Sequence, residues 1–277
     1  MHPFHVGSLA VWKHSIETPK ARLLLVHGLS EHSGRHFHTI DFLVRSGIEV
    51  IRFDLRGAGE SGGRRQWIEQ FQDYIEDTTA VFNWIQRELP PLPLFLFGHS
   101  LGGAIALSFA SSYHTFLKGL ILSAPAYWVG EGVSPWKIKV GQALVKIAPN
   151  LRLPKSTGSE GISRDKAAVE RYLNDPLCCH FNTLKQGDEI LKTLPLMPQF
   201  AKKVTTPTLI VHGSADPIIR LEGSFELVKA LGSKSKELFI APHCYHEIHN
   251  ELEEDRLHYF NHLGMWLEGQ IKSKRSV

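Results

Sequence analysis

The sequence predicts an α/β fold in which a mostly parallel sheet is covered by helices on both faces. Six short apolar runs alternate with segments of helical periodicity. Strands that are apolar along their whole length are buried on both sides, which is typical of parallel sheets between two helix layers. At 277 residues, the chain can form this fold as a single domain. The predicted strands are 22–27, 48–54, 94–98, 117–123, 208–213 and 237–241.

Helices are predicted in the segments between these strands. Residues 68–89 place their apolar side chains on one stripe, with acids and amides between them, and Pro90 ends the pattern. Residues 101–112 form a second helix that is rich in glycine and alanine. Residues 256–270 form a helix that closes the chain.

One segment, from about 126 to 204, interrupts this alternation. It has no clear strand but several helical pieces that contain tryptophan, proline and lysine. It also separates two strands that a short connection would otherwise join. We interpret it as a helical cap inserted into a single domain that spans residues 1–277.

The composition excludes several classes of protein. The apolar content of 43% and the charged content of 21% are those of an ordinary soluble globular protein. The formal net charge of +3 is too small to indicate a nucleic-acid partner. Three cysteines do not make a disulfide framework, which favours a reducing compartment. We see no secretory signal and no membrane-spanning run, so we expect a cytoplasmic protein.

The segment Gly98-His99-Ser100-Leu101-Gly102 fits the pattern G-x-S-x-G. It follows a predicted strand and opens a predicted helix, which is the context that a nucleophile elbow requires. The turn is so tight that its flanking positions cannot carry bulky side chains. The sequence therefore predicts Ser100 as a catalytic nucleophile.

A serine hydroxyl needs a base to take its proton. On this scaffold the acid and then the histidine follow the serine along the chain. Asp216 lies just after the predicted strand 208–213, and His246 lies in the loop after 237–241. Both lie beyond the carboxyl ends of strands, where sites collect in open α/β sheets. We therefore predict a triad of Ser100, Asp216 and His246.

A tetrahedral intermediate needs hydrogen-bond donors for its oxyanion. The residue after the nucleophile, Leu101, supplies one backbone N–H, and the loop after strand 22–27 supplies the other. Leu29, which follows His27-Gly28, is the natural choice for the second donor.

Two other patterns suggest sites that we do not predict. His243, His246 and His249 are spaced by three, but they follow a strand and do not match the H-E-x-x-H pattern of zinc helices. The glycine-rich loop 54–62 lacks the Lys-Ser/Thr of a phosphate-binding loop. We interpret it as a loop that an Asp–Arg contact orders beside the site. The triad needs no metal ion and no cofactor.

Several strings together resemble the monoacylglycerol lipase-like family of α/β-hydrolases, which includes lysophospholipase-like bacterial members. The similarity extends over about residues 21–270. The strings at 27–35 and 172–177 are more particular to this family than the others. The strings are 27–35 (HGLSEHSGR), 54–62 (DLRGAGESG), 98–103 (GHSLGG), 163–165 (SRD), 172–177 (YLNDPL), 212–216 (HGSAD), and Tyr245-His246 with Asn250-Glu251.

The resemblance implies the α/β-hydrolase fold, with a mostly parallel eight-stranded sheet and a cap over the site. It implies hydrolysis of a monoacylglycerol to glycerol and a fatty acid, with Ser100, Asp216 and His246 as the triad. Leu29 and Leu101 stand where members often have alanine and methionine. The cap is the least similar part, so the acyl-chain length stays open. A lysophospholipase or a short-chain carboxylesterase is the alternative, and a non-catalytic ligand-binding protein is a remote one.

The cap also carries an amphipathic pattern. Two interpretations of it are open: the helix packs on the core with its lysines in solvent, or the cap rests on anionic lipid and guides the substrate inward. The second would add a peripheral membrane contact to the small-molecule lipid ester as a partner. The apolar stripe is Trp136, Val140, Ala143, Leu144 and Ile147, and the lysines are Lys137, Lys139 and Lys146.

Overall fold

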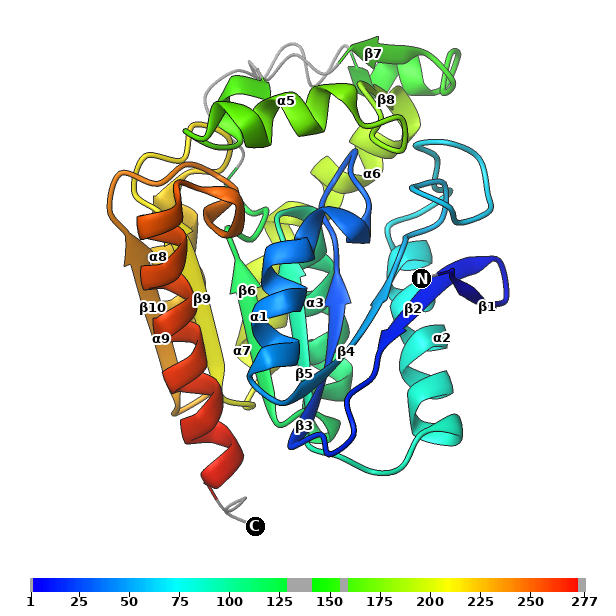
Figure 1. Cartoon of the computed structure of the whole chain (residues 1–277). Helices are drawn as coiled ribbons and strands as arrows, with labels where there is room; N and C mark the ends of the chain where they lie inside the picture. The colour runs from blue at the N-terminus through cyan, green and yellow to red at the C-terminus, as the bar shows by residue number, and fades with distance from the viewer. Residues whose placement is uncertain (1, 129–140, 155–158, 274–277) are drawn as a thin grey trace.

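The computed structural model describes residues 2–128, 141–154 and 159–273 (Figure 1). Its central feature is an eight-stranded sheet in the order β1-β2-β4-β3-β5-β6-β9-β10. All neighbours from β4 to β10 pair in parallel, and only β1 and β2 are antiparallel to their neighbours. The strands are β1 (Phe4–Val6), β2 (Leu9–His14), β3 (Ala21–Val26), β4 (Ile48–Phe53), β5 (Leu94–His99), β6 (Gly119–Ser123), β9 (Thr208–Gly213) and β10 (Lys236–Ala241).

Helices cover both faces of the sheet, as the sequence predicts. In β3, Leu24 and Val26 belong to one hydrophobic core, whereas Leu23 and Leu25 belong to the other. This alternation follows from the two-residue period of a strand. The first core is shared with α2 (Gln72–Glu88), α3 (Leu101–Tyr113), α7 (Met197–Lys203) and α8 (Leu221–Ala230). The second is shared with α1 (Phe37–Arg45) and α9 (Glu253–Lys272), which lie in front of the sheet in Figure 1.

The structure differs from the prediction at a few elements. The β1–β2 hairpin, α1 and α8 were not predicted. Helix α2 begins at Gln72 and not at Ile68, because the Asp73 carboxylate accepts the N–H groups of Glu69 (2.8 Å) and Gln70 (3.3 Å) and holds them in a turn. An acceptor placed there satisfies backbone donors that have no partner inside the helix.

The segment between β6 and β9 is mainly helical but includes a small sheet. Two short strands, β7 (Arg152–Pro154) and β8 (Phe181–Thr183), pair antiparallel, although no strand was predicted there. Together with α5 (Lys166–Asn174) and α6 (Leu184–Thr193), they lie beyond the carboxyl ends of the central strands (Figure 1). The predicted residues Trp136, Val140, Lys137 and Lys139 fall outside the described residues. Among those that are described, no helix is long and apolar enough to cross a bilayer.

Candidate active site

Ser100 occupies a strained turn between β5 and α3. Its backbone has φ 53° and ψ −119°, a conformation that a residue with a side chain rarely adopts. A Cβ on Gly98 would lie 2.2 Å from the carbonyl oxygen of Gly102, and a Cβ on Gly102 would lie 2.3 Å from that of Val26. Both flanking positions therefore require glycine. The turn has the strand–turn–helix geometry of the predicted nucleophile elbow, and it leaves Ser100 partly exposed.

Hydrogen bonds on both sides hold this turn in place. The Ser100 N–H donates to the carbonyl of Ser123 at the end of β6 (2.9 Å). The Ser100 carbonyl accepts from the N–H groups of Gly103 (2.9 Å) and Ala126 (2.9 Å). The serine is thus fixed to a neighbouring strand and to the first turn of α3, which offsets the cost of its backbone conformation.

Asp216 and His246 meet at the same edge of the sheet. Asp216 follows β9 and His246 follows β10, and these strands pair in parallel, so their carboxyl ends lie together. Asp216 Oδ2 lies 2.7 Å from His246 Nδ1. The Asp216 side chain is fully buried, and the His246 side chain is 6% exposed. An imidazole held at Nδ1 by a carboxylate presents Nε2 on its other side, as a general base requires.

Asp216 is an anion in this site. Burial alone would raise the pKa of Asp216, but the charge of His246 and hydrogen bonds from His212 and His246 outweigh it and hold this pKa well below its usual range. The N–H groups of Ile218 (2.8 Å) and Ile219 (3.0 Å) also donate to Oδ1. The carboxylate is therefore ionised and rigidly oriented at neutral pH.

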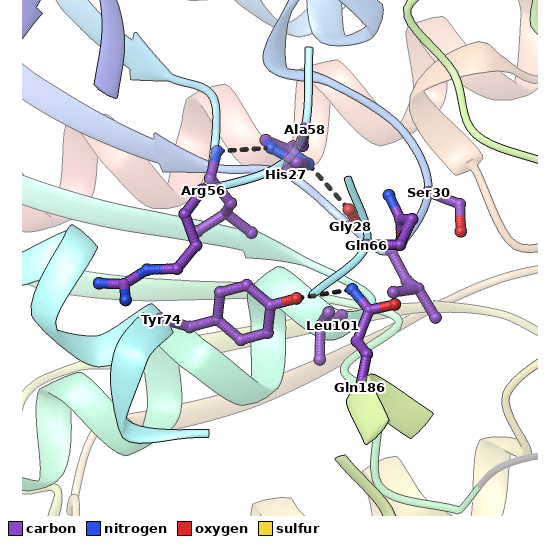
Figure 2. A pocket seen from close by; sticks show the side chains of 11 residues that line it. His27, Gly28, Ser30, Arg56, Ala58, Gln66, Tyr74, Leu101 and Gln186 are labelled. Atoms are coloured by element: carbon purple, nitrogen blue, oxygen red, sulfur yellow. Dashed lines mark hydrogen bonds between the residues drawn. The ribbon is translucent and has the colours of Figure 1, made fainter. Parts of the chain in front are cut away.

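The loop after β3 passes close to the elbow. A Cβ on Gly28 would lie 3.2 Å from Ser100 Cβ and 2.9 Å from Glu31 Oε1, so glycine lets the loop approach the elbow closely without displacing these side chains. Leu29 and Leu101 both help line a small cavity of about 10 Å³, roughly the room that one water needs, and Figure 2 shows Leu101 at this cavity. Within the described part of the chain, neither the Leu29 nor the Leu101 backbone N–H donates a hydrogen bond. Neither of the two predicted oxyanion donors is therefore used by an acceptor in the described part of the chain.

A buried cluster of histidines, which was not predicted, lies next to His246. The rings of His36 and His249 stack with their centroids 4.5 Å apart, and His99 lies edge-on to both. The His99 ring is also 4.8 Å from that of His246. Burial, and then the neighbouring His246, lowers the pKa of His99 well below its usual range. The signal that could have found the cluster is that His99 lies within one string that resembles the family, while His36 and His249 lie directly beside two others.

The glycine-rich loop 54–62 is ordered by two carboxylates. Asp54 accepts from the Ser33 N–H (2.8 Å) and from the Glu60 N–H (2.9 Å). Arg56 makes the expected Asp–Arg contact, and its partner is Asp77 of α2 (2.7 Å). These contacts hold the loop in a fixed conformation, as the sequence interpretation expects.

The histidines spaced by three diverge from one another. His243 is exposed, His246 contacts Asp216, and His249 is buried against His36. In the described part of the chain, one group could bring three ligand atoms within 4.8 Å of one another, namely His32, Asp175 and Cys178. His32 Nε2 and Asp175 Oδ2 are already paired at 2.9 Å, and burial raises the pKa of the Cys178 thiol. In this structure His32 and Asp175 are bonded to each other, and the raised pKa keeps the Cys178 thiol protonated at neutral pH.

The chain is similar to known proteins over most of its length. The model of a family described as "Serine aminopeptidase, S33" matches residues 17–253. The chain belongs to this family of serine hydrolases. Its relatives include a monoacylglycerol lipase of Mycolicibacterium smegmatis, 34% identical over 85% of this chain and 84% of the relative. The human monoglyceride lipase is 33% identical over 90% of this chain and 83% of its own length.

Solved structures agree with these relatives. The crystal structure of the Paleococcus ferrophilus monoacylglycerol lipase superposes with a TM-score of 0.85 at 29% identity, over 95% of this chain and 99% of that one. The predicted α/β-hydrolase fold and the predicted resemblance to monoacylglycerol lipase-like hydrolases are both confirmed. Members of the S33 family are serine hydrolases, and the chain is accordingly a serine ester hydrolase.

Proposed function

We propose that this chain hydrolyses monoacylglycerols to glycerol and free fatty acid through an acyl-enzyme. The observation that carries the proposal is the contact between Asp216 and His246, on the sheet edge where the elbow holds Ser100. The lipase relatives, which match nearly the whole chain, support the substrate class.

In the first half-reaction, His246 Nε2 takes the Ser100 proton as Ser100 Oγ attacks the ester carbonyl carbon. The carbonyl oxygen becomes an oxyanion that accepts from the N–H groups of Leu29 and Leu101. Asp216 stabilises the imidazolium that forms. When the C–O bond to glycerol breaks, His246 returns the proton to the leaving oxygen, and the acyl group stays on Ser100.

In the second half-reaction, a water molecule replaces the glycerol. His246 takes one water proton while the hydroxide oxygen bonds to the acyl carbon. The bond from that carbon to Ser100 Oγ then breaks, and the proton returns to Ser100. The fatty acid leaves, and the enzyme is restored without a cofactor or a metal ion.

We further propose that the segment between β6 and β9 is a cap over the site and that its surface rests on lipid. Leu144 and Ile147 are 40% and 84% exposed, so this part of the predicted apolar stripe does not pack on the core. Leu151 and Leu153 are also exposed on the same segment, and Lys146, which precedes Ile147 in the sequence, is exposed as well. Neighbouring apolar and basic side chains favour an anionic lipid surface over solvent. All three cysteines are free, which is consistent with a protein that works in the reducing cytoplasm.

A substrate panel tests the activity. The purified protein and Ser100→Ala are compared on monoacylglycerols of several chain lengths, lysophosphatidylcholine, short p-nitrophenyl esters and an amino-acid arylamide. Fastest turnover of long monoacylglycerols, lost in Ser100→Ala, supports the proposal. Turnover confined to lysophosphatidylcholine, short esters or the arylamide would retain the triad and replace the substrate. No turnover at all would favour a binding protein.

Vesicle co-sedimentation tests the lipid contact. Ile147→Ser should weaken binding to vesicles that contain phosphatidylserine, because a well-exposed apolar side chain is removed from the contact. Met265→Ser is the matched control, since Met265 is 68% exposed on α9, away from the cap. No binding of the wild type at low salt, or equal effects of the two substitutions, would overturn the proposed membrane contact.

A further inference from the structure

A buried histidine holds the peptide group that carries one of the oxyanion donors. His27 follows the last residue of β3 and is 1% exposed. Its Nδ1 lies 2.8 Å from the Gly28 carbonyl oxygen, and its Nε2 lies 3.0 Å from the Leu55 backbone nitrogen (Figure 2). Both ring nitrogens therefore have partners, and both partners are backbone atoms.

These partners fix the tautomer of the ring. The Leu55 N–H can only donate, so Nε2 must accept. A neutral imidazole carries one proton, which must then lie on Nδ1 and point at the Gly28 carbonyl, a group that can only accept. Burial lowers the pKa of His27 against the opposing charges of Asp54 and Glu31, which keeps the ring neutral.

The hydrogen bond to the Gly28 carbonyl also sets the direction of the Leu29 N–H. The C=O and N–H of one trans peptide group point in opposite directions. The His27 ring holds the Gly28 carbonyl on one side, so the Leu29 N–H points to the other. That N–H has no acceptor among the described residues. The preceding peptide is fixed as well, because the Gly28 N–H donates to Glu31 Oε1 (2.6 Å).

We propose that His27 is a positioning residue for ester hydrolysis, whose Nδ1–H aims the Leu29 N–H at the oxygen that becomes the oxyanion. The inference rests on the proposed function, with Ser100 as nucleophile. His27 acts through the Gly28–Leu29 peptide and does not touch the substrate. A misdirected donor weakens binding of the transition state more than binding of the ester, so loss of His27 should lower kcat and leave KM nearly unchanged.

Two substitutions of His27 separate its two hydrogen bonds, because each keeps one of them and loses the other. In His27→Asn, the side-chain amide can reach only the Nδ1 position, so it keeps the bond to the Gly28 carbonyl and loses the bond from Leu55. In His27→Gln, the longer amide reaches the Nε2 position and keeps only the bond from Leu55. Each variant loses one hydrogen bond from the same buried site, so each is the control for the other. His27→Ala loses both.

We expect His27→Ala and His27→Gln to lower kcat on the order of 10- to 100-fold with KM nearly unchanged, less than the loss of a whole oxyanion donor. His27→Asn should recover most of kcat. Titration with a fluorophosphonate normalises each kcat to folded active sites, and thermal denaturation gives each Tm. Equal losses of kcat in Asn and Gln, or losses that follow Tm, would overturn the proposal.

The wild-type protein supplies a test that does not depend on the folding of variants. The ¹⁵N chemical shifts of the His27 ring should report a protonated Nδ1 and an unprotonated Nε2. A proton on Nε2 would remove the donor to Gly28 and overturn the inference. Failure of the proposed function gives a different result, because the wild type would then hydrolyse no ester faster than Ser100→Ala, whatever the tautomer of His27.

Discussion

Asp216 Oδ2 lies 2.7 Å from His246 Nδ1, although the two residues are 30 positions apart and follow different strands. In the proposed mechanism this contact orients the ring, whereas Ser100 forms the covalent bond, so the two residues should differ in their effect on kcat. Ser100→Ala should lower kcat on the order of 10⁴- to 10⁶-fold, and Asp216→Ala should cost less, on the order of 10³- to 10⁴-fold. Steady-state kinetics on one ester checks this order, and an equal loss in both variants would contradict it.

The same carboxylate links stability to pH. Because the pKa of Asp216 is lowered in the folded protein, the folded state binds fewer protons than the unfolded state at pH values near and below about 4. Its stabilising effect is present above the unfolded pKa and is lost as the pH falls through about 4 towards the lower folded pKa. As the pH falls, the free energy of unfolding should therefore decrease less steeply in Asp216→Asn than in the wild type.

Urea unfolding at about pH 5 and about pH 3 measures that slope. Asp41→Asn is the control, because the Asp41 side chain is 60% exposed on α1 and its ion pair with Arg45 lies in solvent. Asp41→Asn should keep the pH dependence of the wild type. If Asp216→Asn kept it as well, the ionised, buried state of Asp216 would be contradicted.

The elbow should tolerate no side chain at Gly102. A Cβ there would lie 2.3 Å from the Val26 carbonyl and 2.4 Å from the His27 carbonyl, and both atoms belong to rigid backbone. Gly102→Ala should destabilise the fold by about 1–3 kcal/mol or more and lower kcat as Ser100 shifts. Gly269→Ala in α9 is the matched control, since its Cβ would meet nothing within 4 Å. It should gain up to about 1 kcal/mol, and thermal denaturation compares the two.

Much of the fold follows from local pattern. The run at β9 is buried from end to end around the apolar core Leu209–Val211, and its predicted bounds match those of the structure. The β1–β2 hairpin has no such run: β1 has three residues, and the turn depends on Gly7 with φ 61°. Short edge strands of this kind are stabilised by pairing with a neighbour, which a local window of sequence does not contain.

Some features of the site could also be predicted from the sequence, and others could not. The meeting of Asp216 and His246 could be predicted, because the carboxyl ends of parallel strands lie at one edge whatever their distance along the chain. The part played by His27 could not, since its partners are backbone atoms of Gly28 and Leu55 that carry no side-chain signature. The buried pair of Arg35 with Glu247 joins residues 212 positions apart and follows no periodicity.

That pair supports a last prediction, on stability. Arg35 lies between two buried carboxylates, with Nη2 2.6 Å from Glu247 Oε2 and Nε 3.2 Å from Glu31 Oε2. Arg35→Met would keep much of the side-chain volume but leave two buried anions without their cation. Breaking a buried ion pair in this way costs about 3–5 kcal/mol.

The exposed pair of Arg45 and Asp41 on α1 provides the control for this change. Its atoms lie 3.0 Å apart, yet the side chains are 79% and 60% exposed, so solvent screens their attraction. Arg45→Met should therefore cost only about 0.3–0.5 kcal/mol. Urea unfolding of the two variants at neutral pH measures the difference. Similar small losses in both would mean that Glu31 and Glu247 take up protons when Arg35 is removed, and a repeat at higher pH, where those protons are lost, should then restore the larger loss for Arg35→Met alone.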